Sequence, residues 1–388
     1  MLEVVTDPVL PVYGHRSLAE VLPALLTALG VPGEAPGQPG LELAPAPAVA
    51  LLLVDGLGSE LLRTHAADAP FLASLSDAGP LTVGFPSSTS ISLTSLGTGL
   101  PPGAHGMLGI SFRTAPDELL DTLQWRSVGT PEPVDLRERR PPEEIQPSTT
   151  VFERAAAAGV EVTVVSKAEF GGSGLTRAAL RGGRYAGTYA LGDLAAEMIG
   201  ALAGQGRRLV YGYHADLDAL GHLYGPGTLP WRLQLSQVDR LAALVAEHLP
   251  PDGMLVVTGD HGMVRVDRVV DADTDPALRS GVDLLGGDPR SRHVYVQPGA
   301  QDDVLAVWRA VLGDGAWVVP GEQAVAEGWF GRVDQRMRNR IGDVVVAARG
   351  GTAVVRSVAE PVLAGLPGQH GSLTVAEQVV PLLVARPA

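Results

Sequence analysis

An unbroken apolar run at Ala48–Val54 constrains the fold of this chain most strongly, because such a run is typical of a strand covered on both faces. A helical pattern follows at 59–66, and strand and helix then alternate towards the C-terminus. Further strands are expected at 160–165, 209–213, 254–257, 293–296 and 343–347, and helices at 17–29, 151–158, 191–202, 231–248 and 374–383. The alternation predicts an α/β fold with a doubly wound, mostly parallel sheet flanked by helices on both faces.

Three stretches interrupt the alternation of strands and helices, at 112–148, 264–288 and 320–340, and the first is rich in charged residues and proline. We expect them to be loop insertions that form a small cap over one edge of the sheet, with plain surface loops as the alternative. The glycine- and proline-rich stretch 32–47 is expected to be a loop. A chain of 388 residues can form one large domain, so residues 1–388 are expected to be a single domain.

Composition excludes several classes of function. Acidic residues outnumber basic ones by 43 to 29, which argues against a surface for nucleic-acid polymers but not against a small nucleotide. The absence of cysteine excludes disulfides and thiolate metal sites. The N-terminal residues show no signal-peptide pattern and no apolar run is long enough to span a bilayer, so we expect a cytoplasmic protein without membrane association.

Metal-ligating side chains follow three of the expected strands. Asp55 comes directly after the first strand, Asp218 lies shortly after the strand at 209–213, and Asp260-His261 follows the strand at 254–257. Since ligands in open α/β sheets bind beyond the carboxyl ends of the strands, these side chains should meet at one edge. Crowded carboxylates repel one another, and divalent cations would remove that cost. On a helical turn, Asp218 and His222 share one face, and their mixed oxygen and nitrogen ligands suit zinc.

A hydroxyl nucleophile is expected at the start of a helix near Thr89. A helical pattern over 90–96 ends at Gly97-Thr98-Gly99, and a hydroxyl at a helix N-terminus lies where free N–H groups favour an alkoxide and a phosphate. Local pattern alone leaves open which hydroxyl takes this role, because Ser87, Ser88 and Ser90 compete with Thr89. A simple helix cap is the alternative reading.

Together these motifs resemble the alkaline phosphatase superfamily, and most closely its nucleotide pyrophosphatase/phosphodiesterase branch. Thr89 stands nine residues before Thr98-Gly99, as the nucleophile does in that family, and His105-Gly106 follows. The stretch from Asp218 to Pro226 matches the family pattern Asp-x-x-Gly-His-x-x-Gly-Pro. Asp260-His261-Gly262 and His370-Gly371 match two further motifs, so that the resemblance extends from Asp55 to His370.

The resemblance implies an alkaline-phosphatase-like fold and a two-metal hydrolase that cleaves phosphodiester or nucleotide pyrophosphate bonds through a covalent phospho-threonine. Two divalent ions are implied, with zinc expected and manganese compatible with the same ligands. One ion would be held by Asp218, His222 and His370, and the other by Asp55, Asp260, His261 and Thr89. The expected partner is a small phosphorylated substrate, such as a nucleotide.

One position departs from the family pattern. Where the phosphodiesterase branch usually carries an asparagine that donates to a phosphoryl oxygen, this chain has Ile110, which cannot donate. Ser111, Arg113 and Lys167, the single lysine of the chain, are candidate substitutes, and backbone N–H groups near Ser90 are candidates for a phosphoryl oxygen. The alternatives are a phosphomonoesterase, which would use a cation such as Arg126 or Arg177, and a degenerate member that binds a phosphorylated ligand. Neither the natural substrate nor the oligomeric state has a sequence signal.

Overall fold

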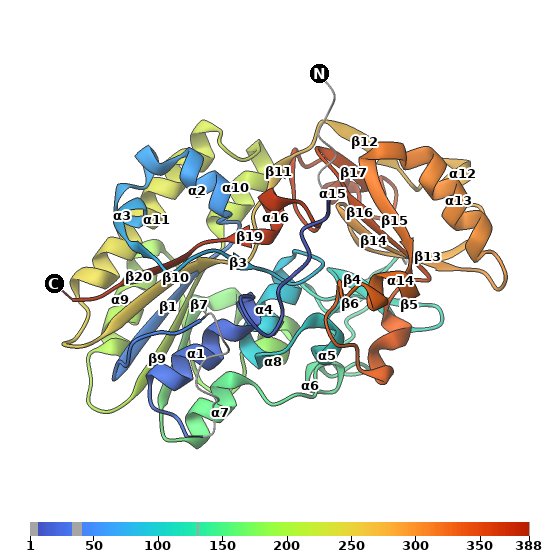
Figure 1. Cartoon of the computed structure of the whole chain (residues 1–388). Helices are drawn as coiled ribbons and strands as arrows, with labels where there is room; N and C mark the ends of the chain where they lie inside the picture. The colour runs from blue at the N-terminus through green and yellow to red at the C-terminus, as the bar shows by residue number, and fades with distance from the viewer. Residues whose placement is uncertain (1–6, 33–40, 130–131, 388) are drawn as a thin grey trace.

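The computed structural model describes residues 7–32, 41–129 and 132–387. Its central sheet has seven strands in the order β2-β20-β10-β1-β9-β7-β8 (Figure 1). Strands β10, β1, β9, β7 and β8 run parallel, while β20 and β2 pair antiparallel at one edge. Their bounds are β1 (Ala48–Val54), β2 (Ser76–Asp77), β7 (Glu161–Lys167), β8 (Arg184–Thr188), β9 (Arg208–His214), β10 (Met254–Gly259) and β20 (Leu382–Ala385). The predicted doubly wound, mostly parallel sheet is therefore confirmed.

Alternate side chains of β1 enter two separate cores, which is why its sequence is apolar throughout. Val49, Leu51 and Leu53 pack on one face and Ala50 and Leu52 on the other, all fully buried. The first face is covered by α1 (Val21–Ala28), α4 (Thr89–Thr98), α7 (Val151–Ala157) and α8 (Gly174–Ala179). The second is covered by α2 (Ser59–Thr64), α3 (Pro70–Ser74), α9 (Leu191–Leu202) and α11 (Leu229–Glu247). Helices on both faces are what the alternation of elements predicts.

Capping residues explain where several helices begin and end. The Ser17 N–H and hydroxyl both bond to the Glu20 carboxylate, although the first turn there is the 3₁₀-helix η1 (Leu18–Glu20) rather than α-helix. Thr150 and Glu153 form the reciprocal pair at the start of α7. Helix α4 ends at Gly99, whose φ of 73° is the left-handed conformation that glycine adopts without strain.

The loop predicted at 32–47 lies partly outside the described residues.

A second lobe lies beside the main sheet (Figure 1). Its four strands pair antiparallel in the order β13-β14-β16-β15, and Trp308 and Leu312 of the adjoining helix are fully buried in a separate apolar core. The elements are β13 (Val282–Asp288), β14 (Ser291–Val296), β15 (Ala316–Pro320), β16 (Val344–Ala348), α12 (Pro276–Arg279), α13 (Gln301–Leu312), α14 (Gly321–Ala326) and η5 (Gln335–Arg340). Strands were expected at 293–296 and 343–347, but assigning them to the main sheet was wrong: they pair with each other and with β13 and β15.

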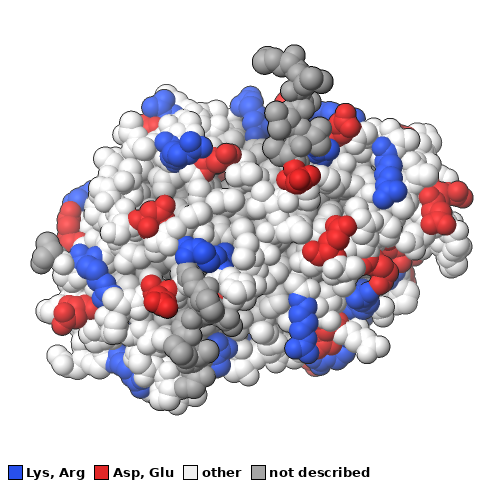
Figure 2. Space-filling view, in the orientation of Figure 1, with Lys and Arg blue, Asp and Glu red and all other residues white. Residues whose placement is uncertain are grey.

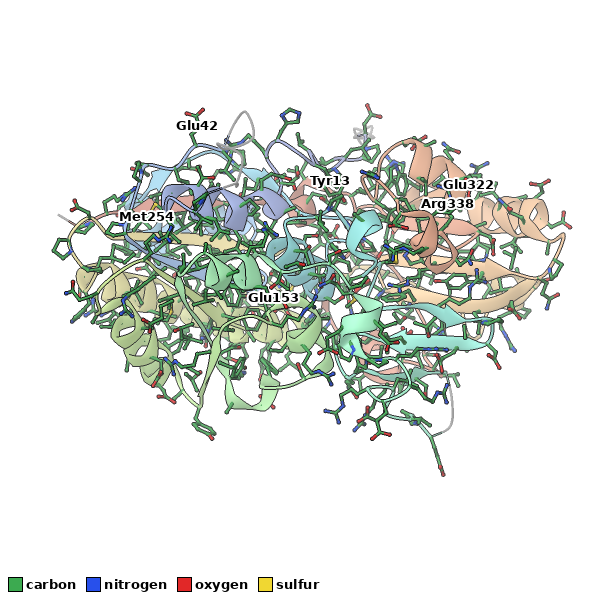
Figure 3. All side chains as sticks on the ribbon, turned by 90° about the horizontal axis from the view of Figure 1, so that it is seen from below. Tyr13, Glu42, Glu153, Met254, Glu322 and Arg338 are labelled. Atoms are coloured by element: carbon green, nitrogen blue, oxygen red, sulfur yellow. The ribbon has the colours of Figure 1, made fainter. Side chains whose placement is uncertain are left out.

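The stretch 112–148 also forms structure rather than a plain loop. It contributes to the three-stranded antiparallel sheet β4 (Ser111–Ala115), β5 (Glu118–Asp121) and β6 (Arg126–Val128), and contains α6 (Pro142–Ile145). On the surface of the second lobe, Arg338 of η5 pairs with Glu322 of α14, and the two lie next to each other in Figure 3. The three stretches that interrupt the alternation thus all lie outside the main sheet.

The predicted closing helix at 374–383 is wrong. Only α16 (Val375–Gln378) is helical there, and it is followed by β19 (Val379–Val380) and by β20, which pairs antiparallel with β10. Pro381 lacks the N–H that a continuing helix would use, and Leu382–Ala385 instead satisfies the edge of β10. An apolar run of this length fits a strand or a helix, and here the unpaired sheet edge decides between them.

The remaining elements are β3 (Leu81–Thr82), β11 (Val264–Arg265), β12 (Arg268–Asp271), β17 (Thr352–Val355), β18 (Gly368–Gln369), α5 (Pro102–His105), α10 (Asp216–Tyr224), α15 (Pro361–Ala364), η2 (Ala66–Asp68), η3 (Ala168–Phe170) and η4 (Gly313–Gly315). On the face shown in Figure 2, acidic and basic side chains are interspersed. Within the described ranges, no helix combines the length and the apolar character needed to cross a bilayer.

Candidate metal centre

The predicted site residues converge beyond the carboxyl ends of three neighbouring strands. Asp55 follows β1, Asp260 and His261 follow β10, and Asp218 and His222 lie on α10, which begins just after β9. Thr89 is the first residue of α4, and His370 follows β18. Because β10, β1 and β9 are adjacent and parallel, their carboxyl ends meet at one edge, where the structure brings all seven residues together.

One group of ligand atoms surrounds His261. Its Nε2 lies 3.4 Å from Asp55 Oδ1 and 3.4 Å from Asp260 Oδ2. The Thr89 hydroxyl lies 3.3 Å from the same nitrogen and 3.5 Å from Asp55 Oδ2. Asp55, Asp260 and His261 are buried, and each can offer one ligand atom to a common metal ion.

The second group adjoins the first. His222 Nε2 lies 3.3 Å from Asp218 Oδ2 and 3.2 Å from His370 Nε2. The ring of His370 also stacks on that of His261, with ring centres 3.5 Å apart, so that Asp218, His370 and His261 likewise present ligand atoms close to one another. The two groups therefore form one continuous cluster in which His261 lies between the Asp55 side and the Asp218 side.

Hydrogen bonds on the far sides of the three imidazoles fix which nitrogen faces the cluster. His222 Nδ1 lies 2.7 Å from the Gly368 carbonyl, His370 Nδ1 lies 2.9 Å from the Ser87 carbonyl, and His261 Nδ1 lies 3.0 Å from the Gly262 carbonyl. A carbonyl oxygen can only accept, so each Nδ1 carries the hydrogen. Every Nε2 is then left with a lone pair directed into the cluster, as in histidines that bind metals.

One oxygen of each carboxylate in the cluster lacks a hydrogen-bond donor among the described residues. Burial, followed by repulsion from Asp260 and Asp218, raises the pKa of Asp55 well above its ordinary value, and burial also raises the pKa values of Asp218 and Asp260. Asp55 Oδ1, Asp218 Oδ1 and Asp260 Oδ2 are buried without a hydrogen-bond partner among the described residues. Buried unpaired carboxylate oxygens are costly, and divalent cations would satisfy them. The donor set of three carboxylates and three imidazoles thus fits divalent metal ions such as zinc.

Tertiary contacts separate Thr89 from its serine neighbours. The Ser87 hydroxyl donates to the Ser372 carbonyl, that of Ser88 to the Asp288 carboxylate, and that of Ser90 to the Gly109 carbonyl. All three serines are buried, and none of these acceptors belongs to the cluster. Of the four hydroxyls, that of Thr89 alone has its partners in the cluster. It lies at the N-terminus of a ten-residue helix whose first amides lack intrahelical acceptors.

The candidate substrate-binding residues occupy different surroundings. Ile110 donates its backbone N–H to Asp288, and its side chain lines a neighbouring pocket. The Arg113 guanidinium lies over the Tyr295 ring, 4.3 Å from its centre, and bonds to the Asn339 carbonyl, so that it is held by the second lobe. Lys167 pairs with Asp216, the first residue of α10. The structure therefore brings none of these three side chains into a contact with the metal ligands.

Two further residues support the cluster without having been predicted. Tyr213, the residue before the end of β9, donates its hydroxyl to Asp55 Oδ2. The buried carboxylate of Asp288 accepts from the Ser88 hydroxyl at 2.8 Å and from the Ile110 N–H at 3.2 Å, which ties the second lobe to the residue before Thr89. Tyr213 could have been found from its place at the carboxyl end of a strand, whereas Asp288 lies in an insertion without any motif.

Residues 49–373 match the family model described as type I phosphodiesterase / nucleotide pyrophosphatase. No curated protein sequence was found to match.

Among solved structures, murine ectonucleotide pyrophosphatase/phosphodiesterase 5 is similar over 88% of both chains, with 18% identity and a TM-score of 0.65. An inactive variant of that murine protein in complex with AMP gives 16% identity and a TM-score of 0.64 over the same shares. Phosphonoacetate hydrolase from Sinorhizobium meliloti 1021, in complex with phosphonoformate, is 21% identical over 88% of this chain and 90% of its own, with a TM-score of 0.63. The fold is thus that of these phosphoester and phosphonate hydrolases, and the chain belongs to the type I phosphodiesterase / nucleotide pyrophosphatase family.

Proposed function

We propose that the protein is a metal-dependent phosphodiesterase in which Thr89 attacks phosphorus and becomes transiently phosphorylated. The observation that carries this proposal is one continuous cluster of three imidazole lone pairs and three carboxylate oxygens without a partner among the described residues. The Thr89 hydroxyl, at a helix N-terminus, contacts this cluster through Asp55 and His261. This set of groups suits a bound phosphoryl group and an ionised hydroxyl when divalent cations balance the carboxylates.

Two divalent ions, zinc being expected, would be held by the two ligand groups. In this proposal Asp218, His222 and His370 hold one, and Asp55, Asp260, His261 and Thr89 hold the other. When bound, such ions lower the pKa of a coordinated hydroxyl and neutralise charge on phosphoryl oxygens. Tyr213 supports this role by holding one Asp55 oxygen, which leaves the other directed towards His261.

The proposed reaction has two displacements at phosphorus. In the first, Thr89 Oγ loses its proton to solvent and forms a bond to phosphorus, while the bond to the leaving oxygen breaks and that oxygen takes up a proton. In the second, a water oxygen forms the new bond to phosphorus, the bond to Oγ breaks, and the water proton restores the Thr89 hydroxyl. In this proposal the backbone N–H groups of Thr89 and Ser90, in the first turn of α4, hold a phosphoryl oxygen.

A diester substrate is favoured over a monoester because three of the candidate cations are engaged elsewhere, while Arg126 lies across from Asp121 in the β5–β6 pair. A monoester carries an extra negative charge that a nearby cation would balance. Arg177 instead pairs with Glu143 at 2.7 Å, Lys167 pairs with Asp216, and Arg113 is held by the second lobe. The similar murine protein binds AMP, and we propose small nucleotide-like diesters or pyrophosphates as substrates here. We further propose residues 1–388 as one catalytic domain whose insertions form the cap.

A paired assay on metal-analysed protein tests the proposal. The protein should hydrolyse bis-p-nitrophenyl phosphate in preference to p-nitrophenyl phosphate. Thr89→Ala should lower kcat by at least about a thousandfold. Acid quenching during turnover should trap a phosphoryl group on the peptide that contains Thr89.

Thr98→Ala is the matched control, because its hydroxyl bonds within the same helix, to the Thr94 carbonyl. That variant should retain activity. Unchanged activity in Thr89→Ala would reject the nucleophile, and a preference for the monoester would reject the diester assignment. Binding of phosphorylated ligand without any turnover would favour the degenerate alternative.

A further inference from the structure

The turn between β13 and β14 of the second lobe packs against the segment that carries His370. Asp288 is the last residue of β13, and Arg290 lies in the short link to β14. Both side chains are almost fully buried. Gly371 has little room for a side chain, because a Cβ there would lie 3.1 Å from the Cβ of Asp288 and 3.3 Å from that of Arg290. One turn of the second lobe therefore lies directly behind the candidate metal centre.

Arg290 holds this segment through Glu377. Its guanidinium donates to both carboxylate oxygens of Glu377, at 3.0 and 2.7 Å. The Glu377 carboxylate also accepts the Ser372 N–H at 3.0 Å, and its backbone carbonyl accepts the Gly262 N–H at 2.9 Å. Ser372 lies two residues after His370, and Gly262 directly follows another expected ligand. The contacts of Arg290 thus extend to the backbone beside two ligand histidines.

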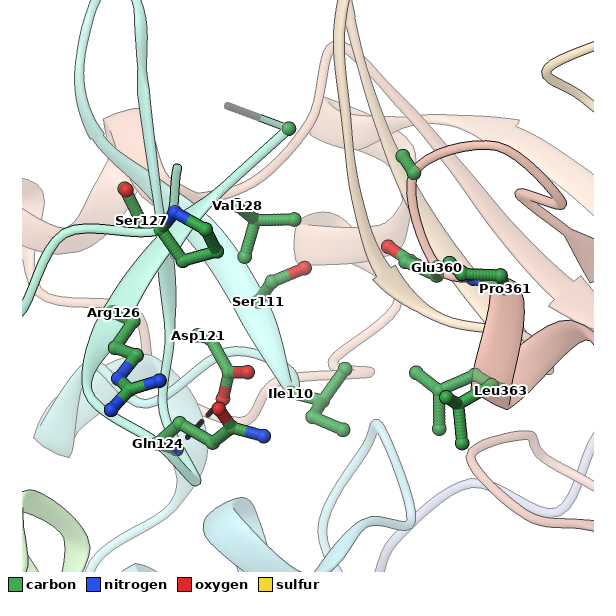
Figure 4. Close-up of a pocket in the computed structure, with 14 residues that line it drawn as sticks. Ile110, Ser111, Asp121, Gln124, Arg126, Ser127, Val128, Glu360, Pro361 and Leu363 are labelled. Carbon is green, nitrogen blue, oxygen red and sulfur yellow. Dashed lines mark hydrogen bonds between the residues drawn. The ribbon is translucent and has the colours of Figure 1, made fainter. Parts of the chain in front are cut away.

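Asp288 holds the backbone that precedes the nucleophile. Its Oδ1 accepts from the hydroxyl of Ser88, the residue directly before Thr89, at 2.8 Å. Its Oδ2 accepts the N–H of Ile110 at 3.2 Å, and the side chain of Ile110 lines the neighbouring pocket (Figure 4). The start of α4 and the loop at Ile110 are therefore both bonded to one carboxylate of the second lobe.

Ser87 connects the nucleophile segment with the His370 segment. Its N–H donates to the Gly371 carbonyl at 3.2 Å, its hydroxyl donates to the Ser372 carbonyl at 2.8 Å, and its carbonyl accepts from His370 Nδ1 at 2.9 Å. A shift of the β13–β14 turn would therefore change the place of Thr89 relative to His370. Displacement at phosphorus depends steeply on such placement, since an error of about 1 Å can cost about a hundredfold in rate.

We propose that Asp288 and Arg290 are positioning residues, which hold Thr89 and His370 at the separation that in-line attack on phosphorus requires. They act through Ser88 and Glu377 rather than on the substrate. The second lobe then takes part in catalysis by fixing the geometry of the centre. The inference rests on the proposed function and deepens it, because the roles of Thr89 and His370 belong to that proposal.

Arg290→Lys tests the contact with Glu377. The lysine keeps the charge but cannot form the paired contact with both carboxylate oxygens. On the full chain, a competition titration with a chromophoric chelator should show zinc affinity lowered by about tenfold to a hundredfold. With bis-p-nitrophenyl phosphate, kcat should fall about a hundredfold while KM changes by less than about threefold, because misplaced groups impair the transition state more than binding.

Arg292→Lys is the matched control. Arg292, on β14, is also almost fully buried and also donates to both oxygens of one carboxylate, that of Glu360. Glu360 lies outside the segment 370–377, on a wall of the pocket next to Ile110 (Figure 4). Both variants should unfold at lower urea concentration than wild type, but Arg292→Lys should keep its zinc affinity and kcat. Equal losses of zinc affinity and kcat in the two variants would mean general loosening of the second lobe and would overturn the proposal.

Two variants of Asp288 test whether its geometry or its charge matters. Asp288→Leu removes both acceptors and should lower kcat about a hundredfold. Asp288→Asn should keep at least about a third of the wild-type kcat, because the amide oxygen can accept the Ile110 N–H while the amide NH₂ donates to the Ser88 hydroxyl. If Asp288→Asn is as impaired as Asp288→Leu, the charge is what matters, and the positioning role of Asp288 is overturned.

Zinc affinity needs no turnover, so it separates this inference from the proposed function. If the wild type hydrolyses neither ester, a loss of zinc affinity confined to Arg290→Lys would still support the positioning of His370. If the wild type is active and Arg290→Lys keeps its zinc affinity and kcat, the positioning role is overturned while the proposed function stands. A wild type that binds no zinc would overturn both. Thr374→Val, which removes one donor to Glu377, serves if Arg290→Lys does not fold, and its losses should be smaller but in the same direction.

Discussion

At the scale of single residues, Tyr213 tests whether hydrogen bonds behind the ligands tune the centre. Tyr213→Phe removes the donor to Asp55 and should weaken zinc binding by about tenfold to a hundredfold. Tyr211, two residues earlier on β9, is the matched control, because its buried hydroxyl has no hydrogen-bond partner among the described residues. Tyr211→Phe should leave zinc affinity unchanged in a competition titration with a chromophoric chelator. Equal losses in both variants would contradict the role of Tyr213.

Asp288 should make stability depend on pH. Burial raises its pKa from 3.8 to about 6, against hydrogen bonds from Ser88 and Ile110 that lower it. The folded state therefore favours the protonated Asp288 carboxyl, which contributes about 3 kcal/mol to the free energy of unfolding. This contribution is complete below about pH 4 and is lost as the pH rises through 6. Urea unfolding should show that the free energy of unfolding of wild type relative to Asp288→Asn falls between pH 4 and 7.5. A constant difference would contradict the raised pKa.

At the scale of elements, one buried ion pair joins the second lobe to the segment that carries His370. Arg290, between β13 and β14, bonds to Glu377 of α16 at 2.7 Å, and both side chains are fully buried. Glu377 also accepts the Ser372 N–H, two residues after His370. Glu377→Gln leaves the Arg290 charge without its partner and should lower the free energy of unfolding by about 3–5 kcal/mol.

The surface pair between Glu322 and Arg338 provides the control for that prediction, because the two side chains are 73% and 40% exposed (Figure 3). Glu322→Gln should change the free energy of unfolding by less than about 1 kcal/mol in the same urea titration. A loss of similar size in both variants would mean that burial does not decide the effect of these pairs.

At the scale of the whole molecule, metal removal should expose the repulsion between the clustered carboxylates. A chelator should lower the Tm at pH 7.5 by at least about 5 °C, because ions that bind the folded state stabilise it. Asp55→Asn removes one repelling charge and should reverse the order of stability, being less stable than wild type with zinc but more stable without it. Differential scanning calorimetry of both proteins, before and after zinc is added back, checks the change in Tm and the reversed order of stability. The same order in both conditions would contradict a metal site at Asp55.

Much of the architecture and of the candidate site could be predicted because it depends on local patterns. The apolar run at Ala48–Val54 predicts a strand with two covered faces, and carboxylates after parallel strands must share one edge. The same reasoning predicted that Asp55, Asp218 and Asp260 lie together at that edge. It failed for the strands at 293–296 and 343–347, because a strand pattern does not say which sheet the strand joins.

The sequence by itself determined the helix and strand periodicity and the kinds of side chain at the strand ends, because both depend on neighbours along the chain. Only the tertiary structure decided the rest. It paired the C-terminal run as β20 with β10, directed the hydroxyls of Ser87, Ser88 and Ser90 away from the cluster, and placed Tyr213 against Asp55. It also brought Ile110 and Leu363, which are more than 200 residues apart along the chain, into the lining of one pocket. These features depend on contacts between distant segments, which become defined only when the chain packs.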